Sequence, residues 1–88
     1  MKHNLKKIVR RRLKIIEGQV RGLQSMVEND AYCIDVITQT SAIKRALSSV
    51  EDVLLERHLS SCVVDQVKNG KQAKAAKEIL KVYSLKRA

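Results

Sequence analysis

The sequence contains no proline, no tryptophan and no phenylalanine, and only three of its 88 residues are glycine. Because proline and glycine are the residues that most readily interrupt a helix, their scarcity favours long helices. The chain also lacks any stretch of roughly 18 uninterrupted apolar residues, the length that a membrane-spanning helix needs, and its first residues do not resemble a signal peptide. These absences predict one small all-α domain over residues 1–88, working in the cytoplasm.

Acidic residues are also few. Eighteen Lys and Arg stand against nine Asp and Glu, which gives a formal net charge of +9. Such a surplus favours a polyanionic partner, with DNA or RNA first and an anionic membrane surface second. We expect no enzymatic activity, because the sequence shows no combination of nucleophile, base and oxyanion-stabilising group.

A first helix is predicted over about residues 5–28, because apolar residues recur there at steps of three and four. Gly18 and Gly22 lie inside it at i, i+4 spacing. Such a pair either lets a second helix approach closely or is simply tolerated at a cost of about 1 kcal/mol each, and both interpretations remain open. The apolar positions are Leu5, Val9, Leu13, Ile16, Val20, Leu23 and Val27.

A second and much longer helix is predicted over about residues 31–67, with Asp30 as its N-cap. Two series with a seven-residue repeat run along it, which is typical of a coiled-coil seam. Asn69-Gly70 is expected to end this helix, since glycine readily adopts the left-handed conformation there. A short third helix follows over about residues 71–83, and the tail SLKRA is expected to fray. The repeats are Cys33, Thr40, Leu47 and Leu54, and beside them Val36, Ile43 and Val50.

The two cysteines allow three interpretations in a reducing compartment: buried apolar residues, metal ligands or reactive thiols. The stretch ERHLSSC places His58 and Cys62 at i, i+4 spacing, so an imidazole and a thiol lie on one side of a helix. Only Cys33 remains to supply a second thiolate. These three side chains are the candidate ligands of a metal ion.

A single chain is not expected to close this site. Cys33 precedes His58 by 25 residues of predicted helix, which is roughly 37 Å at 1.5 Å per residue. Yet Cys33, His58 and Cys62 lie on one stripe of that helix, so two copies paired antiparallel would form two equivalent sites. Soft sulfur ligands and a low coordination number, here two thiolates and one imidazole, favour Cu(I) over zinc, nickel or cobalt.

Two further residues are candidates for an outer shell around the metal. Tyr32 adjoins Cys33, and Glu78 of the third helix is placed to accept a hydrogen bond from the second imidazole nitrogen of His58. An ordinary packing tyrosine and an ordinary solvent-facing acid are the alternative interpretation, and the spacing alone does not decide between them.

Three stretches of the chain resemble the CsoR/RcnR family of small all-helical repressors. They are RLKIIEGQVRGLQSMVE in the first helix, AYCIDVITQTSA at the start of the second, and HLSSC further along it. The resemblance covers nearly the whole chain. The sequence contains both Cys33, His58 and Cys62 and the RL and EGQVRG pattern of the first helix. Similarity to the copper-sensing branch implies a three-helix protomer with one very long central helix, an antiparallel homodimer, and a dimer of dimers as homotetramer.

The resemblance also implies a mechanism. Cu(I) would be bound by Cys33 of one protomer with His58 and Cys62 of the other, with Tyr32 and Glu78 in the outer shell. The metal-free protein would repress transcription by binding operator DNA, and Cu(I) would release it. The family has no standard helix-turn-helix, and its DNA contacts lie on basic surfaces of the first two helices. The candidates here are Arg12, Arg10, Arg11, Lys14, Lys44 and Arg45.

Three other functions remain open. Nickel and cobalt sensors of the family have histidine where Cys62 stands and use an N-terminal histidine, for which His3 is the candidate. A sensor of reactive sulfur or electrophiles would use Cys33 as the attacking thiolate and Cys62 as its resolving partner. A cytoplasmic copper buffer or chaperone would use the same ligands without binding operator DNA.

Overall fold

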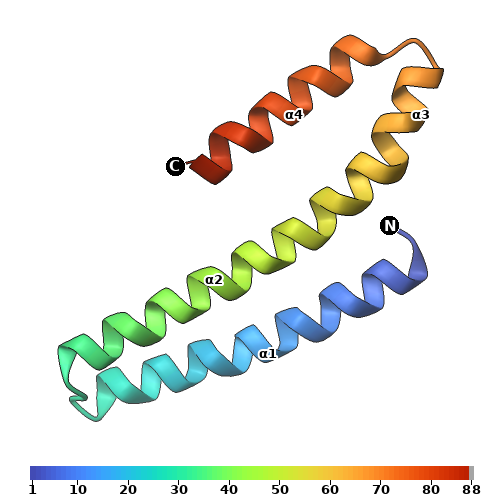
Figure 1. The fold of residues 1–88 in the computed structure, drawn as a ribbon. Helices are drawn as coiled ribbons and strands as arrows, with labels where there is room; N and C mark the ends of the chain where they lie inside the picture. Colours follow the sequence, from blue (N-terminus) through green and yellow to red (C-terminus); the bar gives the residue numbers. More distant parts are fainter. Residues whose placement is uncertain (88) are drawn as a thin grey trace. The chain divides into compact units, whose positions relative to one another are not determined.

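The computed structural model describes residues 1–87, and these residues are almost entirely helical, with no β-strand among them. Helix α1 spans His3–Glu28 and helix α2 spans Cys33–Arg57 (Figure 1). A five-residue π-helical segment, η1, follows over His58–Cys62 and continues into α3 over Val63–Lys68. Helix α4 spans Gln72–Arg87. The all-α prediction is confirmed, and helical backbone runs without a break over residues 33–68, against a predicted central helix over about 31–67.

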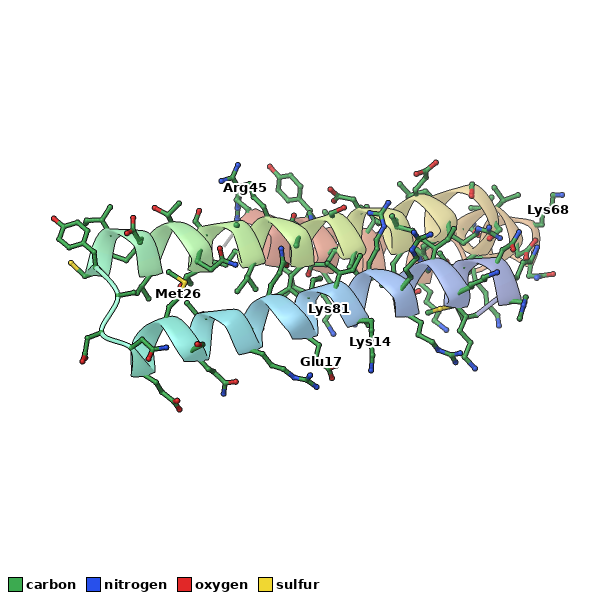
Figure 2. All side chains as sticks on the ribbon, turned by 90° about the horizontal axis from the view of Figure 1, so that it is seen from below. Lys14, Glu17, Met26, Arg45, Lys68 and Lys81 are labelled. Carbon is green, nitrogen blue, oxygen red and sulfur yellow. The ribbon has the colours of Figure 1, made fainter. Side chains whose placement is uncertain are left out.

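Contacts divide the chain into two compact units, Met1–Val53 and Leu54–Ala88. In the first unit α1 runs back antiparallel along α2, as Figures 1 and 2 show. Of the two heptad series, Val36, Ile43 and Val50 are half-buried or buried, whereas Cys33, Thr40 and Leu47 are exposed. The first series therefore provides the inner seam of this unit. The buried side chains of the unit are Leu5, Val9, Ile16, Ile43 and Val50.

The turn between α1 and α2 corrects the prediction that Asp30 caps the second helix. Asp30 instead ends α1, with a left-handed φ of 54°. Its N–H donates to the carbonyl of Val27 (3.2 Å), and the next N–H, of Ala31, donates to Met26 (2.9 Å). This is the Schellman arrangement, which satisfies the last carbonyls of a helix and usually carries glycine at the left-handed position. Aspartate tolerates that conformation better than most residues, so it substitutes for glycine here.

The second unit ends its first helical stretch in the same way. Gly70 has a φ of 72°, its N–H donates to Val67 (3.1 Å), and Lys71 donates to Gln66 (2.7 Å). The prediction that Asn69-Gly70 closes the helix is therefore confirmed. Helix α3 and helix α4 are then neighbours, and Ala75 is the one side chain described as buried in this unit.

The last helix is longer than predicted. We expected it to end near Tyr83 with a frayed SLKRA tail, but α4 continues to Arg87. The guanidinium of Arg87 lies 5.3 Å from the centre of the Tyr83 ring, one helical turn away. This cation–π contact, together with cations in the last turn that suit the helix dipole, accounts for the extra turn.

Many large apolar side chains stay exposed. On α2 they include Ile34, Ile37 and Leu47, and on α4 Leu80 and Tyr83. No side chain among residues 1–87 has less than 2% of its surface accessible, so the apolar interior of one protomer is thin. A search of the same residues finds no helix with both the length and the apolar character needed to cross a membrane.

Candidate metal centre and nucleic-acid interface

His58 and Cys62 are the first and last residues of the π-helical segment η1. The N–H of Val63 donates to the carbonyl of His58, an i→i+5 bond that widens the turn relative to an α-helix. The sequence predicted helix through this stretch, and the structure is helical here, with a π-helical bonding pattern over these five residues that the sequence did not predict. Single π turns inside α-helices occur frequently at functional sites, and this one is bounded by two candidate ligands.

Serine side chains lie between the two ligands and contact the backbone of the same turn. The hydroxyls of Ser60 and Ser61 both donate to the carbonyl of Arg57, at 3.2 and 3.0 Å. The oxygen of Ser61 also lies 4.0 Å from the sulfur of Cys62. Cys62 is exposed and its thiol is free, while His58 is half-buried.

The remaining candidate ligand belongs to the first unit. Cys33 is the first residue of α2, where its free thiol is exposed. Tyr32 immediately precedes it, and the Tyr32 carbonyl accepts the N–H groups of Asp35 (3.0 Å) and Val36 (3.2 Å). The Tyr32 ring is 68% exposed, so it is not a packing residue of this protomer. Among residues 1–87 no group of three His, Cys, Asp or Glu side chains is close enough to hold a metal ion within one chain.

Glu78 lies near His58 in the second unit. Its carboxylate accepts a hydrogen bond from the side-chain amide of Gln66, at 2.8 Å. The pKa of Glu78 is lowered from its ordinary 4.5, chiefly by this hydrogen bond and then by electrostatic interaction with Lys74, His58 and Lys81, against an opposing effect of desolvation. These contacts favour the ionised form of the carboxylate.

Gln66 is a residue that the sequence reasoning missed. It follows Cys62 by four residues, so the i, i+4 spacing that linked His58 to Cys62 would have pointed to it. Its amide nitrogen bonds Glu78, and its amide oxygen is buried without a partner among the described residues. Gln66 therefore joins α3 to α4 beside the candidate metal ligands.

The donor set fits a soft monovalent ion. One helical turn presents an imidazole and a thiol, and a second exposed thiol is available on the same chain. Thiolates select Cu(I) or zinc, and a set of two sulfurs with one nitrogen lacks the fourth ligand that structural zinc usually has. His58 and Cys62 would hold the ion together with a Cys33 thiolate.

The predicted DNA contacts are not gathered on one surface. Arg12 is half-buried, and its guanidinium donates to the hydroxyl of Ser49 on α2, at 2.6 Å. Figure 2 shows Lys14 projecting from the side of α1 that faces away from α2, and Arg45 projecting from the side of α2 that faces away from α1. Lys14 and Arg45 therefore lie on two different faces of the first unit, and Arg12 links its two helices by the hydrogen bond to Ser49.

An open groove of about 600 Å³ on α1 is lined in part by basic residues. Lys6, Arg10 and Lys14 lie along it at i, i+4, i+8 spacing, so their cations form a row. Glu17 closes the row and pairs with Lys14 at 3.5 Å and with Arg21 at 3.4 Å. Lys6 was not among the predicted contacts, although its spacing from Arg10 and Lys14 would have found it. The groove is lined by Met1, Lys6, Val9, Arg10, Leu13, Lys14 and Glu17.

The chain is similar in sequence to proteins named as copper-sensing transcriptional repressors. Over 72 residues the chain is 51% identical to the copper-sensing transcriptional repressor CsoR of Bacillus subtilis, covering 82% of this chain and 71% of that protein. It is 55% identical over 60 residues to the copper-sensing transcriptional repressor RicR of Mycobacterium tuberculosis, covering 68% of this chain and 62% of that one.

A solved structure extends the likeness to the fold. The crystal structure of the copper-sensing repressor CsoR with Cu(I) from Geobacillus thermodenitrificans matches with a TM-score of 0.91 and 40% sequence identity. The match covers 100% of this chain and 92% of that one. The family described as metal-sensitive transcriptional repressors matches residues 5–84. The resemblance seen in the sequence is confirmed, and the chain belongs to the family of metal-sensitive transcriptional repressors.

Proposed function

We propose that the protein is a Cu(I)-sensing transcriptional repressor, which binds operator DNA when metal-free and releases it when Cu(I) binds. The observation that carries the proposal is the pair of candidate ligands, the His58 imidazole and the Cys62 thiol, at the two ends of one π turn. The relatives named as copper-sensing repressors support the same ion. As a DNA-binding regulator without catalytic activity, the protein would act in the cytoplasm.

The metal site is proposed to be shared between two protomers. Cys33 and His58 are separated by the whole of α2, a continuous α-helix, which keeps its two ends apart. The exposed side of α2 that carries Cys33 also carries apolar Ile37 and Leu47, which a second copy would cover. Antiparallel pairing would then bring Cys33 of each protomer to the π turn of the other, with Tyr32 and Glu78 beside the ion. Two such dimers would form the tetramer.

The DNA surface is proposed to include the α1 groove. Its row of Lys6, Arg10 and Lys14 presents cations at a helical spacing suited to successive phosphates. Arg11, Lys44 and Arg45 remain further candidates outside the groove. Arg12 would contribute once its bond to Ser49 opens. Contacts of this kind are mostly to the DNA backbone, so affinity should fall steeply as salt rises.

Coupling between the two ligands is the first test. Operator DNA from the protein's own promoter region is titrated with the metal-free protein and with the Cu(I)-saturated protein. A coupling free energy of about 1 to 3 kcal/mol would weaken DNA binding roughly 5- to 150-fold, and DNA must weaken Cu(I) binding by the same factor. Equal operator affinity in both forms would refute the regulatory proposal, and a specific operator complex would exclude a mere copper buffer or chaperone.

Complementation tests the sharing of the site. Cys33→Ser and Cys62→Ser each remove one thiolate from both sites of a dimer, so each variant alone should lose tight Cu(I) binding. When the two variants are unfolded together and refolded, mixed dimers regain one intact site, made of Cys33 from one protomer with His58 and Cys62 from the other. A site contained in one chain would regain nothing on mixing.

His58→Ala separates a copper switch from a thiol switch. Removing the imidazole should strongly weaken Cu(I) binding and the release of DNA by Cu(I). A sensor that works through Cys33 and Cys62 alone would keep its response to persulfides or electrophiles in this variant. X-ray absorption on the Cu(I) complex gives the count of sulfur and nitrogen ligands directly, and a nitrogen-rich shell would favour nickel or cobalt and a role for His3.

A further inference from the structure

We propose that Ser60 and Ser61 are positioning residues of the metal site: their hydroxyls hold open the π turn that orients His58 relative to Cys62. The effect of the hydroxyls on the π turn concerns the metal-free protein. The effect of the π turn on Cu(I) binding rests on the function proposed above. Three observations support it, namely the bounds of the turn, the contacts of the two hydroxyls, and the geometry that the turn imposes.

The bounds of the turn coincide with the ligands. The π segment begins at His58 and ends at Cys62, while α2 before it and α3 after it are α-helical. The bond from the Val63 N–H to the His58 carbonyl replaces the bond to Leu59 that an α-helix would make. The helix is therefore widened only where it carries the candidate ligands.

The two hydroxyls give a physical cause for the widening. In an α-helix the carbonyl of Arg57 would accept the N–H of Ser61. In this turn it accepts the hydroxyls of Ser60 and Ser61, at 3.2 and 3.0 Å. Hydroxyls that bond a carbonyl of the preceding turn compete with the backbone. Single bonds of this kind, from Thr38 to Ile34 and from Thr40 to Val36, leave α2 α-helical, so we infer that the convergence of two hydroxyls on one carbonyl opens this turn. Proline and glycine, the other usual causes, are absent from the segment.

The π turn changes the relative direction of the two candidate ligands. In an α-helix residues i and i+4 are offset by about 40° around the axis, because a turn holds 3.6 residues. A turn closed by i→i+5 bonds holds more than four residues, so Cys62 is rotated back around the axis relative to its α-helical position, and the sign of its offset from His58 changes. We infer that this rotation sets how the imidazole and the thiol face a shared ion. The contact between the Ser61 oxygen and the Cys62 sulfur lies on the same turn.

The test compares three variants of the full chain. Ser60→Ala with Ser61→Ala removes both hydroxyls, and Ser60→Thr with Ser61→Thr restores them on a slightly larger side chain. Ser84→Ala, at an exposed position of α4, is the matched control. The single variant Ser61→Ala gives the same comparison if the double alanine variant does not fold.

The first measurement needs no metal. Through-hydrogen-bond NMR couplings identify the carbonyl that accepts the Val63 N–H. We expect His58 in the wild type, the threonine variant and the control, and Leu59 in the alanine variant. A Leu59 acceptor in the wild type, or a His58 acceptor in the alanine variant, would overturn the proposal whatever the protein does with copper.

The second measurement is Cu(I) affinity, by competition with a chromophoric chelator. Loss of groups that orient ligands typically costs 10- to 100-fold in metal affinity, so we expect at least about a tenfold loss in the alanine variant. Threonine should restore the affinity and Ser84→Ala should not change it. Unchanged affinity in the alanine variant, or a loss that threonine does not restore, would show that the hydroxyls do not position the ligands. A wild type that fails to bind Cu(I) would instead refute the proposed function and leave the NMR result standing.

Discussion

The interactions that hold each unit together internally differ between the two units of the chain. In the first unit, residues 1–53, α1 and α2 bury five apolar side chains along a regular seam. In the second unit, which begins at Leu54, only Ala75 is described as buried, and α3 is joined to α4 by the hydrogen bond between Gln66 and Glu78. The first unit is therefore built by apolar packing and the second depends more on polar contacts.

The residues that stabilise the fold and the candidate metal ligands His58 and Cys62 therefore lie mostly in different units. The hydrophobic effect scales with buried apolar area, so most of the stability available to one protomer should come from the first unit. The second unit contains His58, Cys62, Gln66 and Glu78, four side chains whose value lies in ligands, charge and hydrogen bonds. A thinly packed unit is also easier to rearrange, which would suit the proposed role of His58 and Cys62 in binding the inducer.

Truncating the apolar seam should have the largest effect. Ile43 is buried in the first unit, and Ile43→Ala should lower the free energy of unfolding by about 2 to 5 kcal/mol, through lost burial and a cavity. Urea unfolding followed by circular dichroism measures it. Ile43→Val provides a graded control, expected to cost about 0.5 to 1.5 kcal/mol. A cost for the alanine variant no greater than for the valine variant would show that the seam does not dominate stability.

Removing the polar tie within the same unit should cost less. Ser49→Ala leaves the half-buried guanidinium of Arg12 without its acceptor, and we expect a loss of about 1 to 3 kcal/mol in unfolding free energy. Ser41→Ala, at an exposed position of the same helix, is the matched control. Stability equal to that of the control would mean that Arg12 does not join the two helices in solution. Operator affinity of Ser49→Ala then shows whether a released Arg12 binds DNA more tightly.

The open surface of α1 gives a smaller effect of opposite sign. A Cβ added at Gly22 would meet no atom within 4 Å in the protomer, so Gly22→Ala should stabilise the helix by about 1 kcal/mol. Thermal unfolding of the variant measures the gain, with Gly18→Ala as a second site of the same kind. A loss of stability at either position would instead indicate that a second copy packs closely against this side of α1.

The hydrogen bond between Gln66 and Glu78 in the second unit should make the free energy of unfolding depend on pH. The folded-state pKa of Glu78 is lowered, chiefly by the hydrogen bond from Gln66, so the ionised carboxylate stabilises the folded state. That stability is present above 4.5, the ordinary value, and is lost as the pH falls through the lowered pKa. The stability difference between the wild type and Glu78→Gln should therefore shrink on acidification, as unfolding curves at pH near 6 and near 3 would show. A difference independent of pH would mean that ionisation of Glu78 adds nothing.

The sequence by itself determined the helices, and it supplied the candidate metal ligands as a prediction. Apolar periodicity and the lack of proline were sufficient for the positions of three helical stretches, because helices form from local patterns. Gly70 marked the end of the central stretch for the same reason. The choice of Cys33, His58 and Cys62 as candidate ligands followed from residue type and spacing, and their placement in one shared site stays a prediction.

Tertiary structure decided what depends on neighbours. Both heptad series of α2 fit a seam equally well in sequence, and only packing against α1 turned Val36, Ile43 and Val50 inward while leaving Cys33 exposed. In sequence, Arg12 cannot be distinguished from the basic residues beside it. In the structure its guanidinium donates to the hydroxyl of Ser49 on the other helix. The π turn over His58–Cys62 was also seen only in the structure. In the first two cases atoms from different helices meet only after the chain has folded, so no local pattern of residues records the outcome.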